Sequence, residues 1–165
     1  MDGPLKNLLV IDLTRVLVGP YCTMILSDLG ARVIKVEAPE VGDDSRKFGP
    51  FIDDYSAYFM SLNRGKESIA LNLKNSDDKK IFDQILSKAD ILVENFKPGT
   101  LDKWGFGWSD VNKKYPKLIY ASASGFGQTG PLKELPAYDM VVQGMGGLMS
   151  VTGQPNSEPT RVGTS

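Results

Sequence analysis

The sequence contains no histidine, and among its 165 residues it has a single cysteine, Cys22. Without histidine, the Ser-His-Asp and Cys-His catalytic arrangements, the HExxH zinc site and imidazole acid–base catalysis are excluded. With one cysteine, the chain can form neither an internal disulfide nor a CxxC pair. Any chemistry of this chain must therefore use carboxylates, lysine or arginine side chains, hydroxyls, backbone amides or a bound cofactor.

The sequence also has no excess of charge and no long apolar run. Lysine plus arginine number 19 and aspartate plus glutamate number 20, a net charge of −1 that argues against nucleic acid or an anionic membrane as the partner. The apolar stretches fall far short of the ~18 residues that a membrane span needs, and the N-terminus lacks the pattern of a secretory signal. We therefore expect a cytoplasmic protein whose length fits one ordinary domain.

Short apolar runs alternate with helical patterns along the chain. Strands are predicted at 8–13, 33–36, 68–73, 91–96 and 118–123, and helices at 21–29, 56–62, 77–89 and 138–149. Thr100 and Ser109 are interpreted as the N-caps of two further short helices. This alternation predicts an α/β fold with a mostly parallel, Rossmann-like sheet flanked by helices. Ligands of such sheets bind in the loops that follow the strands.

The common nucleotide-binding motifs are missing. No GxGxxG follows the first strand, the Gly144–Gly147 stretch lacks the last glycine of that motif, and Gly65-Lys66 does not belong to a P-loop. A NAD-dependent oxidoreductase is therefore disfavoured. Arginine, lysine and asparagine side chains nevertheless follow several strands and could hold an anionic, phosphate-bearing ligand, or they could be ordinary solvated groups. From spacing alone the second interpretation is favoured.

Aromatic residues and the lone cysteine leave further alternatives open. Phe96, Trp104 and Trp108 could stack on an adenine ring or belong to the core, and the core is favoured. Cys22 lies on an apolar helix face and is interpreted as a small core residue rather than a nucleophile. No pair of carboxylates stands out as a general acid and base, so no catalytic residue and no metal ligand is assigned. The residues alone predict an α/β domain that could bind an anionic ligand.

Several longer stretches carry a more specific signal. They are DLTRVLVGPYCTMILSDLGARVIKVEAP, GDDSRKFGP, NRGKESIALNLK, ADILVENFKPGTLDKWGF, YASASGFGQTGP and PAYDMVVQGMGGLMSVTG. In content and order they resemble the class III (CaiB/BaiF-type) CoA-transferases, a family that includes formyl-CoA and carnitine CoA-transferases. The resemblance extends over nearly the whole chain.

The resemblance implies a fold, an assembly and a reaction. Residues 1–165 would form the N-terminal part of a Rossmann-like large domain, with the small domain and the C-terminal part absent. Full-length members would form an interlocked homodimer. The implied reaction moves coenzyme A from an acyl-CoA to a small carboxylic acid through an aspartyl-CoA intermediate, and no metal takes part. Because an ionised aspartate needs no base to activate it, this chemistry suits a chain without histidine.

The resemblance also implies the site residues. Those matching the coenzyme A site are Arg15, Val16, Leu17, Leu71, Lys74, Asn95, Phe96 and Lys103, and those near the acyl end are Tyr138 and Asp139. Two positions depart from the pattern. Ala38 stands where some members place an arginine at the adenine, and Leu17 stands where the formyl-CoA enzymes have a glutamine.

The nucleophile of the family is expected about three residues beyond the segment that ends at Ser165. Two hypotheses follow. In the first, the chain is an N-terminal part of such an enzyme, inactive by itself and with weak or no affinity for coenzyme A. In the second, it is a stand-alone CoA-binding or regulatory module.

Overall fold

The computed structural model describes residues 3–163, and the chain divides into two compact units, the first ending at Ala123 and the second beginning at Ser124. The first unit contains a five-stranded sheet in the order β5-β2-β1-β6-β7, and all four strand pairings are parallel. Its strands are β1 (Leu9–Asp12), β2 (Arg32–Glu37), β5 (Glu67–Ala70), β6 (Ile91–Glu94) and β7 (Ile119–Ser122). The predicted α/β fold with a parallel sheet is therefore confirmed.

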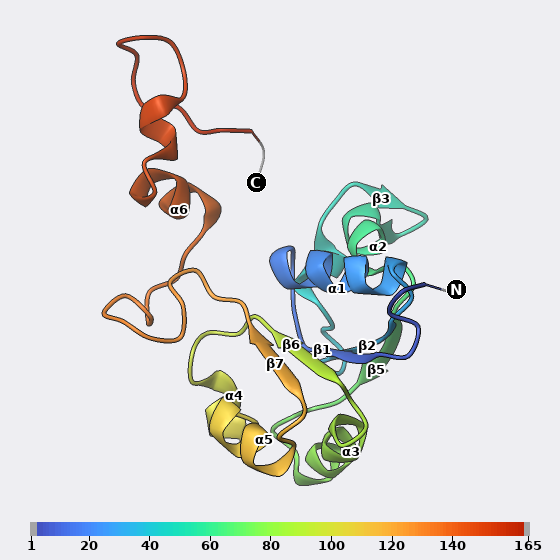
Figure 1. The fold of residues 1–165 in the computed structure, drawn as a ribbon. Coiled ribbons are helices and arrows are strands. Elements are labelled where there is room, and N and C mark those ends of the chain that lie inside the picture. Colours follow the sequence, from blue (N-terminus) through green and yellow to red (C-terminus); the bar gives the residue numbers. More distant parts are fainter. Residues whose placement is uncertain (1–2, 164–165) are drawn as a thin grey trace. The chain divides into compact units, whose positions relative to one another are not determined.

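Helices cover both faces of this sheet (Figure 1). The helices on one face are α1 (Val18–Asp28) and, packed against it, α2 (Ala57–Asn63). Those on the other are α3 (Ser76–Leu86), α4 (Thr100–Trp104) and α5 (Trp108–Lys114). Among residues 3–163, no helix is both long and apolar enough to cross a membrane.

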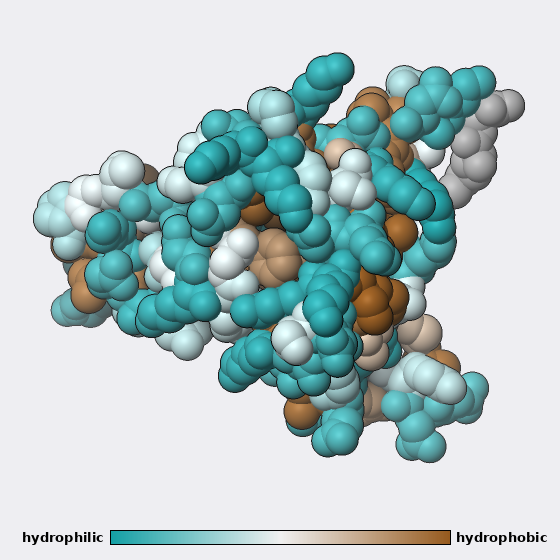
Figure 2. Space-filling view, turned by 90° about the horizontal axis from the view of Figure 1, so that it is seen from below, coloured by the Kyte–Doolittle hydropathy of each residue, from teal (hydrophilic) through white to brown (hydrophobic). Residues whose placement is uncertain are grey.

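The alternation of side chains along each strand separates the two faces chemically. Ile11 and Leu92 point to the α3 side, where they join Phe82 and Leu86 in a large apolar cluster. Their neighbours point to the α1 side, where a smaller cluster holds Val10, Ala31, Val33 and Val93. The outward side of α3 and α5 is polar, and the molecular face on which they lie outermost is mostly hydrophilic (Figure 2).

Several predicted details of the first unit are wrong. Cys22 is exposed on α1 rather than buried. The N-caps of α4 and α5 are Gly99 and Gly107 rather than Thr100 and Ser109, and a glycine has no side chain to offer. Periodicity shows that a helix is amphipathic but not how wide its buried stripe is, which explains the error at Cys22.

The structure adds three short elements to the predicted first unit. They are the 3-10 helix η1 (Asp44–Lys47) and the antiparallel pair β3 (Phe51–Ile52) and β4 (Tyr55–Ser56). Asp53 and Asp54 form the turn between the two strands, both with positive φ, as tight hairpin turns require. Strands of two residues carry too little alternation to be predicted from sequence.

The second unit has one α-helix, α6 (Asp139–Met145), followed by the 3-10 helix η2 (Leu148–Val151). The predicted helix over 138–149 therefore ends early, because Gly147 adopts a φ of 77° that breaks the helix. Gln143 is the one buried residue described in this unit. Its side-chain amide donates to Asp139 and to the carbonyl of Val162 and accepts from the Val162 amide, so it ties the C-terminal segment to α6.

Candidate functional site

A cavity of about 630 Å³ opens at the carboxyl edge of the sheet. Residues that follow β1, β2, β5 and β6 line it, together with part of α4. They are Leu13–Arg15, Val36–Asp43, Leu71–Lys74, Phe96, Thr100 and Trp104. After β1 the chain continues to β2 on one side of the sheet, and after β6 it continues to β7 on the other side, so the switch point of the strand order lies between β1 and β6. Open α/β sheets bind their ligands at such a point, and the cavity borders it.

Half of the residues predicted for coenzyme A line this cavity. Arg15, Leu71, Lys74 and Phe96 come from three separate loops, those after β1, β5 and β6, and the fold brings them into one wall. Ala38 lies in the same wall.

The other predicted residues lie outside the cavity wall. Val16 and Leu17 follow Arg15 beyond it, and Lys103 is exposed on α4 without lining it. Asn95 uses its side chain to bond the main chain of Arg15. Tyr138 and Asp139 belong to the second unit. For all ten residues, contact with a ligand stays a prediction.

The two cations of the wall are accessible to solvent. The Arg15 guanidinium pairs with Asp44, and their side chains are 43% and 56% exposed, so water weakens the pair. Lys74 is exposed, and only its backbone amide is tied, to the side chain of Asn72. An anionic ligand can therefore reach both charges without breaking a buried contact.

The aromatic side chains divide into two groups. Phe96 and Trp104 meet edge to face, with ring centroids 5.3 Å apart, and both line the cavity while packing on the large apolar cluster. They satisfy the core interpretation and also present ring surface to a ligand. Trp108 is 52% exposed and packs against Tyr120, so its assignment to the core is wrong.

Glu37, at the end of β2, already has a full set of hydrogen bonds. Arg46 donates to both carboxylate oxygens at 2.7 and 2.8 Å, Ser68 donates at 2.7 Å and the Asp43 amide at 3.0 Å. Burial alone would raise the pKa of Glu37, but the bonds from Arg46 and Ser68 hold it below its ordinary value. In dinucleotide-binding sheets an acid at this place accepts the ribose hydroxyls. Glu37 has no acceptor left for them, which further disfavours a NAD site.

A group of buried charges behind the cavity was not predicted from the sequence. The Lys66 ammonium lies 2.9 Å from Asp12 and also donates to the carbonyl of Pro20 and to Asn63. Burial lowers the pKa of Lys66, and the Asp12 charge offsets part of that effect. Thr23 on α1 also donates to Asp12, at 2.6 Å. The one sequence signal for this group was an aspartate inside an apolar strand.

No cluster of three or more histidine, cysteine, aspartate or glutamate side chains suited to a metal ion occurs in residues 3–163.

Comparison with known proteins decides the family. The model of CoA-transferase family III matches residues 5–165. The chain belongs to CoA-transferase family III. The resemblance expected from the sequence is thereby confirmed, and with it a fold shared with solved members of the family.

The names of the relatives of this family III chain specify CoA-transferases for different carboxylic acids. It is 58% identical over 161 residues to an acetyl-CoA:oxalate CoA-transferase of Acetobacter aceti, covering 98% of this chain and 41% of that protein. It is 46% identical to a succinyl-CoA:glutarate CoA-transferase of Homo sapiens, covering 98% and 37%. A CaiB/BaiF family protein from Brucella suis superposes with a TM-score of 0.92 at 43% identity, covering 99% of this chain and 44% of that one. The chain thus spans about two fifths of the length of these relatives.

Proposed function

We propose that this chain supplies the coenzyme A-binding part of an acyl-CoA:carboxylate CoA-transferase. The observation that carries the proposal is the cavity at the switch point, with Arg15 and Lys74 exposed at its wall. Membership of CoA-transferase family III supports it, as do relatives named for oxalate and glutarate. The carboxylic acid that accepts coenzyme A in this protein is left open, since the relatives' names differ.

The proposed ligand fits the chemistry of the wall. Coenzyme A is strongly anionic at its nucleotide end, which suits the two accessible cations Arg15 and Lys74. Its adenine offers a flat ring for Phe96 and Trp104. The carboxylate of Glu37 does not compete with the ligand for Arg15 and Lys74, because Arg46 donates to both of its oxygens and neutralises its charge.

The reaction exchanges one thioester for another. The bond between the donor acyl group and the coenzyme A sulfur breaks, a thioester with the acceptor acid forms, and the donor leaves as its free acid. A carboxylate nucleophile accomplishes this through an anhydride and then an enzyme thioester, with no base required. The buried carboxylates Asp12, Glu37 and Asp43 are each held by a cation and hydrogen bonds, so none of them is proposed as that nucleophile. We expect no transfer activity from the 165-residue chain by itself.

Titration of the ¹⁵N-labelled chain with coenzyme A, followed by NMR, tests the proposal at weak affinities. We expect millimolar coenzyme A to shift the amide signals of the loops that follow β1, β2 and β5. Lys74→Ala should weaken this binding about tenfold, the loss of a charge-assisted contact to phosphate.

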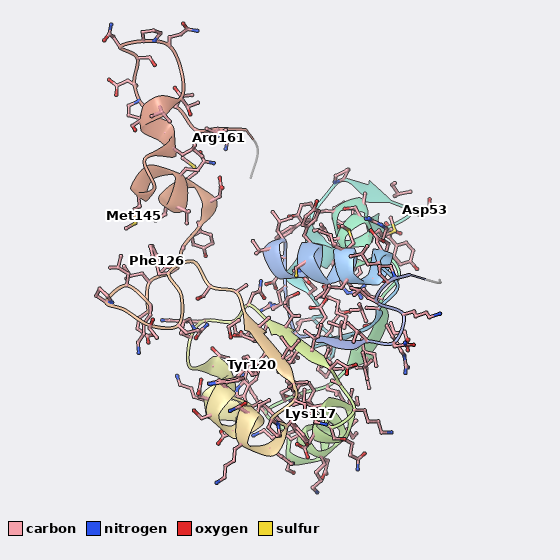
Figure 3. The ribbon with its side chains drawn as sticks, viewed as in Figure 1. Asp53, Lys117, Tyr120, Phe126, Met145 and Arg161 are labelled. Carbon is pink, nitrogen blue, oxygen red and sulfur yellow. The ribbon has the colours of Figure 1, made fainter. Side chains whose placement is uncertain are left out.

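The matched control for Lys74→Ala is Lys117→Ala. Lys117 is exposed just before β7, at the amino edge of the sheet and so opposite the edge that borders the cavity (Figure 3). The Lys117→Ala substitution removes the same charge as Lys74→Ala. Its loss should leave the affinity unchanged. No shift at millimolar coenzyme A, or equal losses in both variants, would overturn the proposed site. Acyl-CoA:carboxylate transfer by the purified chain would overturn the expectation of inactivity.

The interlocked homodimer implied by the resemblance stays a prediction, and so does the cytoplasmic location.

A further inference from the structure

Side chains bind every main-chain polar group from the amide of Thr14 to the amide of Val16. The amides of Thr14, Arg15 and Val16 donate to Asp12, Asn95 and Asp43 at 2.8, 2.8 and 3.1 Å. The carbonyls of Thr14 and Arg15 accept from Lys35 and Asn95 at 2.7 and 2.8 Å. Loops normally satisfy such groups with water or with their own turns. Here the path of the loop after β1 is fixed by side chains from other places: β1, β2, the loop after β2 and the end of β6.

The fixed path is one that the chain would not choose by itself. Val16 has a φ of 69°, in the left-handed region that a β-branched residue rarely adopts. Such a conformation persists only where the surroundings determine it from several sides. The bond from the Val16 amide to Asp43 does so directly, and the bonds of Thr14 and Arg15 fix the two residues before it.

The ion pair behind this loop is expensive to bury. The Lys35 ammonium lies 2.9 Å from Asp43 Oδ2, and the two side chains are 2% and 0% exposed. Asp43 Oδ2 accepts no well-directed hydrogen bond, so the Lys35 charge is its partner, while Oδ1 accepts from Val16 and Ser45. Replacing a buried ion pair by apolar residues is often neutral for stability. Further down the same face, Val10 and Val33 fill the space without charge. What the ion pair provides that valines cannot is its bonds to Thr14 and Val16.

Asn95 has the same relation to the loop. Its amide both donates to and accepts from the main chain of Arg15, and it does not line the cavity. A side chain with both of its hydrogen-bonding ends used in this way has little left to offer a ligand. This placement changes the role that the family resemblance implies for Asn95.

We propose that Lys35, Asp43 and Asn95 are positioning residues that act on the main chain of residues 14–16, so that Thr14 and Arg15 stay in the cavity wall. The inference rests on the proposed function for the identity of the ligand. The arrangement of the loop itself can be measured without ligand. The two can therefore fail separately.

Two double variants isolate the bond to Val16. Lys35→Met/Asp43→Asn removes both charges but keeps an oxygen that accepts from the Val16 amide. Lys35→Met/Asp43→Leu removes the same charges at similar volume and loses that acceptor. We expect similar thermal midpoints. In the Leu variant, hydrogen exchange of the Val16 amide should be about tenfold faster, and coenzyme A affinity about fivefold weaker, than in the Asn variant.

Ser45→Ala serves as the control for the bonds that Ser45 makes to the same oxygen. It should leave the exchange of the Val16 amide unchanged. Equal Val16 exchange and equal coenzyme A affinity in the two folded double variants would overturn the proposal. If the wild-type chain binds no coenzyme A, the proposed function fails, while the exchange rates still decide the positioning role.

Asn95→Ala provides a test that does not disturb the buried ion pair. Asn95 is partly exposed, so its truncation should leave the chain folded. We expect the Arg15 amide to exchange faster and coenzyme A to bind about tenfold more weakly. Asn112→Ala, at an exposed position of α5, is the matched control and should change neither. An Asn95→Ala chain with unchanged Arg15 exchange and unchanged affinity would contradict the assignment, even if the double variants fail to fold.

Discussion

On the face covered by α3, α4 and α5, the sheet buries a continuous apolar cluster in which the rings of Phe82 and Phe106 meet at 4.7 Å. On the face covered by α1, apolar packing extends only part of the way along the strands. Val10 and Val33 fill its amino-terminal half, and Asp12 and Lys35, two residues further along the same strands, fill the half next to the cavity. One sheet therefore carries an apolar core on one face and a buried ionic group on the other.

The difference separates two physical tasks. Apolar packing supplies stability in proportion to the area removed from water and is not directional. Hydrogen bonds and ion pairs contribute less net stability, but each one specifies a distance and a direction. The ionic half lies where the chain must follow an unfavourable path beside the cavity, and the apolar half lies where it need only be compact.

The largest loss of stability is expected on the apolar face, at Phe82. Its side chain is fully buried, so Phe82→Ala should lower the free energy of unfolding by about 4 kcal/mol, from lost burial and the cavity left behind. Urea denaturation followed by circular dichroism measures this loss. Ile81→Ala, one residue away and 43% exposed, should cost much less. Equal losses in the two variants would show that the cluster is not the main source of stability.

A somewhat smaller loss is expected on the ionic face. Lys66→Met leaves the Asp12 carboxylate buried without its cation, which should cost about 3 kcal/mol. Asp12 keeps its hydrogen bonds from Thr14 and Thr23, which places the cost at the low end for a broken buried pair. The double variant Lys66→Met/Asp12→Leu should recover much of the stability in the same urea experiment. A double variant as unstable as the single one would contradict the assignment of this pair as costly to bury.

The smallest effect should appear as a dependence on pH. Burial would raise the pKa of Asp43, but the Lys35 charge and the Ser45 hydrogen bonds hold it below its ordinary value, and Glu37 is lowered by Arg46 in the same direction. The unfolded chain then binds protons first as the pH falls. The stability that these two carboxylates contribute is therefore fully present above about pH 4 and is lost as the pH drops through the lower folded pKa values.

Acid unfolding measures this dependence. Lys35→Met/Asp43→Asn removes one of the two carboxylates, so its stability should fall less steeply below about pH 4 than that of the wild type. Ile81 is an exposed apolar side chain that carries no titratable group, so Ile81→Ala should leave the slope unchanged. Identical slopes in the wild type and the double variant would argue against a lowered pKa at Asp43.

The apolar face was largely predictable from the sequence, and the ionic face was not. Runs such as LLVIDL and ILVENF have the length and apolar content of buried strands, so the order of strands and helices followed from local patterns. The bond between Asp12 and Lys66 joins residues 54 positions apart, and no local pattern indicates which lysine reaches which aspartate. No local pattern marks Lys35, within VIKV, as a buried residue, because a lysine is rarely buried unless a partner elsewhere in the chain pairs with it.

The candidate site divides in the same way. Arg15 and Lys74 were predicted because they follow strands and match a family pattern, and both lie in the cavity wall. Asn95 was predicted from the same pattern, yet its side chain bonds to the loop. A motif records which residues occur together and does not distinguish a residue that contacts a ligand from one that holds its neighbour.

The way in which the loop after β1 is held has a consequence for which of its residues can vary. The five bonds that fix the path of residues 14–16 fall on main-chain atoms, which every amino acid other than proline possesses. The side chains of Val16 and of the following Leu17 take no part in them and are partly exposed. These two positions can therefore be exchanged while the backbone keeps its course, so the side chains there are free to vary without displacing the residues of the cavity wall.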